Sequence, residues 1–128
     1  MKVELTRTYR FEAAHLLPNV PEDHKCRRLH GHSFVVDVTA RGEVDRRTGW
    51  LVDYADMDVA FEPVHAALDH RHLNEIRGLE NATSEVLAAW IWERLGRSVP
   101  GLWRITVRET CDAACAYYGP GDLPARGA

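Results

Sequence analysis

Apolar and polar residues alternate in two segments near the start of the chain. From residue 3 to residue 15 the apolar side chains lie at odd positions among charged and hydroxyl residues, as in a strand with one buried face. From residue 30 past residue 40 the apolar residues lie at even positions. His15 in the first segment, and His30 and His32 in the second, share the apolar side. The pattern therefore predicts two strands that carry histidines on their inner faces.

Two later segments have the three-to-four-residue apolar spacing of helices. The first continues to about Leu68, and we expect Pro63 to bend it or to leave its first turns irregular. The second ends at Gly96. The candidate N-caps are Asp53 or Asp56 for the first helix and Thr83 or Ser84 for the second.

Two short alternating segments, 102–109 and 114–118, predict two further strands. The order is then ββααββ, and the short connections between paired strands favour antiparallel hairpins. We predict an α+β fold in which two helices cover one face of a four-stranded antiparallel sheet. We expect residues 1–128 to form a single domain with a frayed tail at 119–128. The exposed sheet edges favour oligomerisation by strand addition.

Composition limits the possible partners. The 128 residues include 16 Lys and Arg against 19 Asp and Glu, for a formal net charge of −3, which argues against nucleic acid as the main ligand. No segment has the apolar block of a signal peptide or a membrane span, so we expect a cytoplasmic protein that binds small molecules or copies of itself. The three cysteines are an odd number and are interpreted as thiols.

The histidines predict a metal site. Side chains two apart on a strand share a face, so His30 and His32 point the same way, and His15 joins them from the neighbouring strand. Three imidazoles with a fourth position open are typical of catalytic zinc. The alternative is that these are ordinary strand histidines with satisfied hydrogen bonds.

Cys26 lies four residues before His30 and has two interpretations. It is either a fourth ligand that closes a structural site or a reactive thiol, and the exposed, basic loop around it favours a nucleophile or general base. Cys111 and Cys115 fit inert, buried thiols better. The basic neighbours of Cys26 are Lys25, Arg27 and Arg28.

Two acidic positions complete the candidate chemistry. Asp69 and His70 lie at the end of the first helix and supply a carboxylate and an imidazole that can orient and move a proton. Such a pair often serves only as a helix cap. His72 is an alternative to His70 for the proton transfer. Glu109 continues the inward parity of its strand, and a buried charge needs a partner. That partner is either a ligand with adjacent N–H donors, such as a pterin or guanine edge, or solvent or an arginine.

Several motifs together resemble one enzyme family. They are Phe11-Glu12-Ala13-Ala14-His15, Cys26-x-x-x-His30-Gly31-His32-Ser33-Phe34, Leu68-Asp69-His70 with Leu73-Asn74, Thr83-Ser84-Glu85 and Val107-Arg108-Glu109-Thr110-Cys111. This order resembles the 6-pyruvoyl-tetrahydropterin synthase superfamily. Because only three residues separate Cys26 from His30, the chain is most similar to the bacterial 6-carboxy-5,6,7,8-tetrahydropterin synthases of queuosine and 7-deazapurine biosynthesis.

The resemblance implies the tunnelling fold (T-fold) and a homohexamer of two stacked trimers with active sites between subunits. It implies conversion of 7,8-dihydroneopterin triphosphate to 6-carboxy-5,6,7,8-tetrahydropterin, with release of acetaldehyde and triphosphate. The alternatives are a 6-pyruvoyl-tetrahydropterin synthase and a non-catalytic, zinc-stabilised pterin-binding module. The implied roles are Zn²⁺ on His15, His30 and His32, Cys26 as base, Asp69 and His70 as its relay, Glu109 as pterin anchor and relay member, and Thr110 at the substrate.

Overall fold

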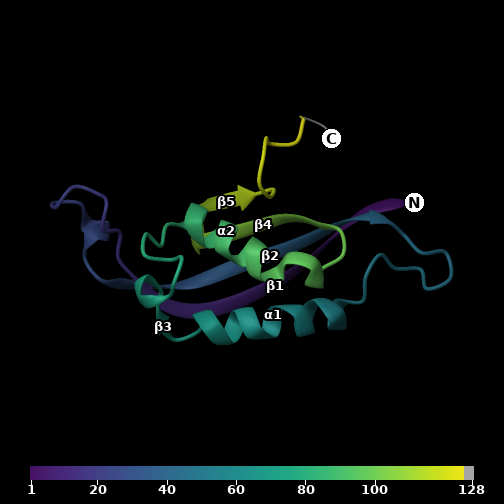
Figure 1. Cartoon of the computed structure of the whole chain (residues 1–128), viewed down its shortest axis with the longest axis horizontal. Coiled ribbons are helices and arrows are strands. Elements are labelled where there is room, and N and C mark those ends of the chain that lie inside the picture. Colours follow the sequence, from purple (N-terminus) through teal and green to yellow (C-terminus); the bar gives the residue numbers. More distant parts are fainter. Residues whose placement is uncertain (126–128) are drawn as a thin grey trace.

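The computed structural model describes residues 1–125, and its centre is a long two-stranded ribbon. Strands β1 (Lys2–His15) and β2 (His30–Glu43) pair antiparallel along their whole length, from Lys2 opposite Glu43 to His15 opposite His30. Both strands contain the predicted alternation. The pairing therefore places the predicted histidines of both strands at the same end of the sheet. Figure 1 shows β1 and β2 running side by side.

The sheet has five strands in the order β3-β1-β2-β4-β5, so the predicted count of four was wrong. Strands β4 (Leu102–Thr110) and β5 (Ala113–Tyr117) continue the antiparallel pairing beyond β2. The additional strand, β3 (Arg71–His72), pairs parallel to the end of β1. Two residues are too few to produce a detectable alternation, which is why the sequence pattern did not indicate β3.

The two predicted helices are present and begin at predicted caps. In α1 (Tyr54–Leu68) the side chain of Asp53 accepts a hydrogen bond from the backbone N–H of Ala55. In α2 (Ser84–Leu95) the hydroxyl of Thr83 accepts one from the N–H of Val86. Pro63 lies inside α1 without ending it. The short 3₁₀ turns are η1 (Lys25–Arg27), η2 (Leu73–Glu75) and η3 (Gly96–Ser98).

The helices cover the sheet face on which the apolar side chains and the histidines lie. The core contains sheet residues such as Phe11, Phe34 and Ile105 together with Phe61 of α1 and Ile91 of α2. The opposite, helix-free face is polar. There Asp37 accepts hydrogen bonds from Thr8 and Arg108, and Thr6 bonds Thr39. Each strand therefore separates a core side from a polar side, as its alternation predicts.

The first residues after β5 pack against α2. Gly119 is buried with φ +91°, and a Cβ there would lie 2.6 Å from the Trp92 ring. Of the predicted tail, residues 126–128 lie outside the described residues. Within residues 1–125, no helix has the length and apolar character needed to cross a membrane.

Candidate metal and active site

Three histidines meet at the end of the sheet where β1 ends and β2 begins. His15 is paired with His30 in the sheet register, and His32 lies two residues further along β2. One ring nitrogen from each of the three lies within 4.8 Å of the others. His15 is only 1% exposed, and His30 and His32 are partly buried. The strand register thus brings the three predicted ligands together.

Backbone carbonyls fix which ring nitrogens of two histidines are free. Nδ1 of His15 lies 2.7 Å from the carbonyl oxygen of Ala82, and Nδ1 of His30 lies 2.7 Å from that of Arg28. Because a carbonyl only accepts hydrogen bonds, each Nδ1 must carry the hydrogen, which leaves a lone pair on Nε2. This is the arrangement that orients metal-binding histidines in many proteins.

The free nitrogen of His15 is the clearest sign that the cluster can bind a metal ion. Its Nε2 atom is buried and has no hydrogen-bond partner among the described residues. An unpaired polar atom in the core is costly. Burial also lowers the pKa of His15, opposed by its bond to the Ala82 carbonyl, so the ring is held in the neutral form that binds a metal. The cluster could therefore hold a metal ion.

Glu109 lies beside the histidine cluster near the end of β4. One of its carboxylate oxygens is 3.9 Å from Nε2 of His32. Glu109 also lines a cavity of about 470 Å³ between β4, β5 and the first turn of α2. The carboxylate is partly buried.

Of the two cysteines expected to be inert and buried, Cys115 is partly buried and Cys111 is not buried. Cys115 lines the same cavity as Glu109, and burial, with the charge of Glu85, raises the pKa of this thiol. Cys111 is exposed rather than buried, because it lies in the turn between β4 and β5. The hydroxyl of Thr110, the other predicted substrate contact, donates a hydrogen bond to Asp112.

Cys26 lies in η1, apart from the cluster of nitrogen atoms. Its backbone N–H donates to Nδ1 of His24, and its carbonyl accepts from the N–H of Leu17, so the turn is fixed at both sides. The side chain is partly exposed. Within residues 1–125 the possible metal ligands that cluster are the three histidines without Cys26. This placement favours a free thiol over a fourth ligand.

Asp69 and His70 form the predicted pair directly after α1. Oδ2 of Asp69 is 2.9 Å from Nδ1 of His70, and Oδ1 accepts a hydrogen bond from the backbone N–H of Glu12. These hydrogen bonds, that from Glu12 first, lower the pKa of Asp69. His70 has φ +58° and its backbone N–H donates to the Glu12 carbonyl. The pair is therefore attached to β1, and Asp69 does more than end the helix.

The Asp69–His70 pair lies at a cavity that one member of the histidine cluster, His32, also lines. His70 is 78% exposed and lines a cavity of about 570 Å³ together with Glu12 and Ser33, whose bonded side chains lie on the helix-free face. Among the described residues, no hydrogen bond or ion pair links this pair to Cys26 or to the metal-site histidines. Within the described residues the pair therefore shares a cavity with His32 but has no bond to Cys26.

Two contributors to the site had no role assigned from the sequence. The first is the backbone carbonyl of Ala82, whose position depends on a loop and not on a side-chain type. The second is Asn74, whose side-chain amide bonds the backbone of Leu16 and Glu80. Asn74 belongs to a motif of the resemblance, but spacing alone gives no sign that it lies beside His15.

The sheet, its two helices and the histidine cluster define an α+β domain with a candidate metal centre. A family model described as 6-pyruvoyl tetrahydropterin synthase matches residues 4–120. The chain belongs to this family and is an enzyme with its T-fold, as the sequence motifs predicted.

Relatives within the family differ in their named activities. The chain is 42% identical over 120 residues to a 6-carboxy-5,6,7,8-tetrahydropterin synthase of Synechocystis, with 89% of this chain and 92% of the relative covered. It is 34% identical over 101 residues to a dihydroneopterin monophosphate aldolase of Pyrococcus furiosus, covering 79% and 82%. The structure of 6-pyruvoyl tetrahydropterin synthase from Caenorhabditis elegans superposes with a TM-score of 0.84 at 30% identity, covering 93% and 96%.

Proposed function

We propose that the chain is a zinc-dependent 6-carboxy-5,6,7,8-tetrahydropterin synthase. It would convert 7,8-dihydroneopterin triphosphate and water to 6-carboxy-5,6,7,8-tetrahydropterin, acetaldehyde and triphosphate. The observation that carries the proposal is the buried Nε2 of His15, which has a free lone pair beside two further histidines and the Glu109 carboxylate. Similarity to the Synechocystis synthase supports the choice of product.

The proposed cofactor is Zn²⁺ held by His15, His30 and His32. Neutral imidazoles are preferred zinc ligands, and the carbonyls of Ala82 and Arg28 already present two of them in the required tautomer. When bound, zinc would supply a Lewis acid for the hydroxyl groups of the substrate side chain.

The protein side chains would carry out the proton transfers and bind the pterin. Cys26, as thiolate, would take a proton from a side-chain carbon, and His70 would deliver protons from a ring that Asp69 holds through Nδ1. The Glu109 carboxylate would accept adjacent N–H groups of the pterin in the neighbouring cavity. The triphosphate leaves, and the bond between the two hydroxyl-bearing carbons breaks.

We propose further that the active site is completed between subunits of a homohexamer. Within the described residues of one chain, His70 lines a cavity together with His32, but no hydrogen bond or ion pair joins His70 to Cys26. A relay from a neighbouring subunit would bring His70 to Cys26. Paired sheet edges in a ring of subunits would also cover the exposed edges. The enzyme would act in the cytoplasm, in queuosine or 7-deazapurine synthesis.

A 6-pyruvoyl-tetrahydropterin synthase is the second candidate, favoured by the solved structure of the Caenorhabditis elegans enzyme. Mass spectrometry of the pterin formed from 7,8-dihydroneopterin triphosphate separates the candidates. We expect the 6-carboxy product. The 6-pyruvoyl product would support the second candidate, and unchanged substrate would support a zinc-stabilised binding module.

A further inference from the structure

The loop before α2 determines how the ring of His15 is oriented. Ala82, the acceptor for Nδ1 of His15, is fully buried at the end of the segment 76–82, which connects η2 to α2. His15 itself ends β1. The orientation of His15 therefore depends on the position of a loop that is distant in sequence from its strand.

Asn74 joins this loop to the end of β1 through its side chain. Its Oδ1 atom accepts a hydrogen bond from the backbone N–H of Leu16, at 2.9 Å. Its Nδ2 atom donates to the carbonyl of Leu16 at 2.8 Å and to the carbonyl of Glu80 at 3.0 Å. Leu16 directly follows His15, and Glu80 precedes Ala82 by two residues. Asn74 thus bonds the backbone on both sides of the His15–Ala82 contact.

The other polar contacts of the loop do not reach β1. The carboxylate of Glu80 accepts from the backbone N–H of Gly78, and the indole N–H of Trp90 donates to the Arg77 carbonyl. These bonds hold the loop to itself and to α2. Among the described residues, the Asn74 amide and the His15–Ala82 bond are the hydrogen bonds that connect the loop with the end of β1.

We propose that Asn74 is a positioning residue for the metal site. By fixing the distance between Leu16 and the loop, it keeps the Ala82 carbonyl in reach of Nδ1 and so holds His15 in the tautomer whose Nε2 lone pair is free. Mutation of a group that orients a metal-binding histidine typically lowers metal affinity by about 10- to 100-fold. The inference rests on the proposed zinc site, but the effect on the His15 tautomer does not require the proposed reaction.

Two variants of Asn74 and one matched control test the inference. Asn74→Asp keeps the shape but loses both N–H donors, and Asn74→Leu removes all three hydrogen bonds. The control is Asn81→Leu, because Asn81 lies in the same loop and its side chain forms no hydrogen bond within the described residues. The readouts are zinc affinity by chelator competition and the His15 tautomer by ¹⁵N NMR of the metal-free protein. Circular dichroism checks the fold.

We expect zinc affinity to fall at least about tenfold in both Asn74 variants and the Nε2–H tautomer of His15 to appear, while Asn81→Leu matches the wild type. If Asn74→Leu does not fold, Asn74→Asp decides the outcome. Wild-type zinc affinity together with an unchanged tautomer in the folded variants would overturn the inference. If the wild type itself binds no zinc, the proposed function fails, and the tautomer still reports on Asn74.

Discussion

At the scale of single residues, the position of Cys26 allows its proposed role as a base to be tested separately from metal binding. The thiol lies outside the cluster of histidine nitrogens. We predict that Cys26→Ala lowers turnover by about 10²- to 10⁴-fold, the usual contribution of a general base, and leaves the zinc content unchanged. Turnover and metal analysis of the same preparation check this. Loss of zinc would identify Cys26 as a ligand, and unchanged turnover would exclude it as the base.

Glu109 provides a second residue-level prediction, about substrate binding. Its carboxylate lines the cavity between β4, β5 and α2 and would accept N–H groups of the pterin. Hydrogen bonds to a charged group are worth about 1.5 to 3 kcal/mol, so Glu109→Gln should weaken pterin binding by about 10- to 100-fold. Calorimetry with an unreactive pterin measures this, with the exposed Glu93→Gln as control. Wild-type affinity in the Glu109 variant would contradict the role.

The predictability of individual residues depended on the kind of interaction they make. Strand alternation was enough to place His15, His30 and His32 on one face, because the direction of a side chain follows from its position in the strand. The roles of Asn74 and the Ala82 carbonyl could not be predicted, because they depend on a loop that folds back to β1.

At the scale of elements, the N-cap of α2 supports the loop that carries Ala82. The Thr83 hydroxyl accepts from the Val86 N–H, whereas the neighbouring Ser84 hydroxyl donates to Glu85. Thr83→Val should therefore lower the free energy of unfolding by about 1 kcal/mol, and Ser84→Ala should change it much less. Denaturant unfolding of the metal-free proteins measures both. Equal effects of the two substitutions would contradict the assignment of Thr83 as the cap.

Most elements were predictable because their patterns are long. The apolar spacing and the caps at Asp53 and Thr83 identified both helices, and alternation identified four strands. Strand β3 was missed, since its two residues form a strand only by pairing with the end of β1. The same pairing places His70 next to Glu12, so the missed element also positions part of the proposed relay.

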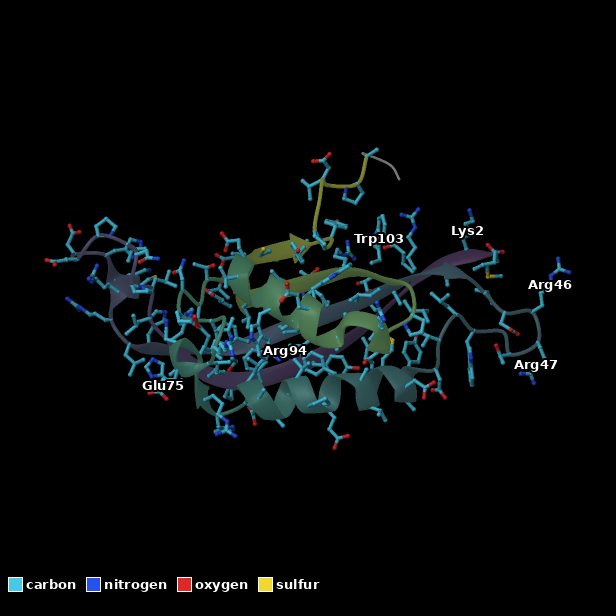
Figure 2. The ribbon with its side chains drawn as sticks, in the orientation of Figure 1. Lys2, Arg46, Arg47, Glu75, Arg94 and Trp103 are labelled. Carbon is cyan, nitrogen blue, oxygen red and sulfur yellow. The ribbon has the colours of Figure 1, made fainter. Side chains whose placement is uncertain are left out.

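At the scale of the whole molecule, Cys26 and His70 share no hydrogen bond or ion pair within the described residues of one chain, and we therefore predict active sites shared between subunits. The two ends of the sheet carry different residues. Figure 2 shows Glu75 near β3, at the end with the histidine cluster, and Lys2, Arg46 and Arg47 at the other end.

If neighbouring subunits contribute Cys26 and His70 to one site, the inactive variants Cys26→Ala and His70→Ala should complement each other when mixed and reassembled. Random assembly should restore about a quarter of wild-type activity.

The mixing experiment can also contradict shared active sites. If both groups of a site come from one chain, every reassembled site contains one defect and activity stays absent. Reassembly of each variant alone is the control. The fold of one subunit was predictable from the sequence because all residues of its core belong to one chain. Shared sites were not predictable in this way, because they depend on surfaces that meet only in an assembly.

We propose that zinc on three histidines and the Cys26 thiol carry out carbon–carbon cleavage of a pterin side chain. The most direct test measures acetaldehyde and triphosphate released from 7,8-dihydroneopterin triphosphate by the zinc-loaded enzyme. We predict that the two products form in equal amounts and that both are lost in Cys26→Ala. Release of triphosphate without acetaldehyde would show that the enzyme does not cleave the carbon–carbon bond.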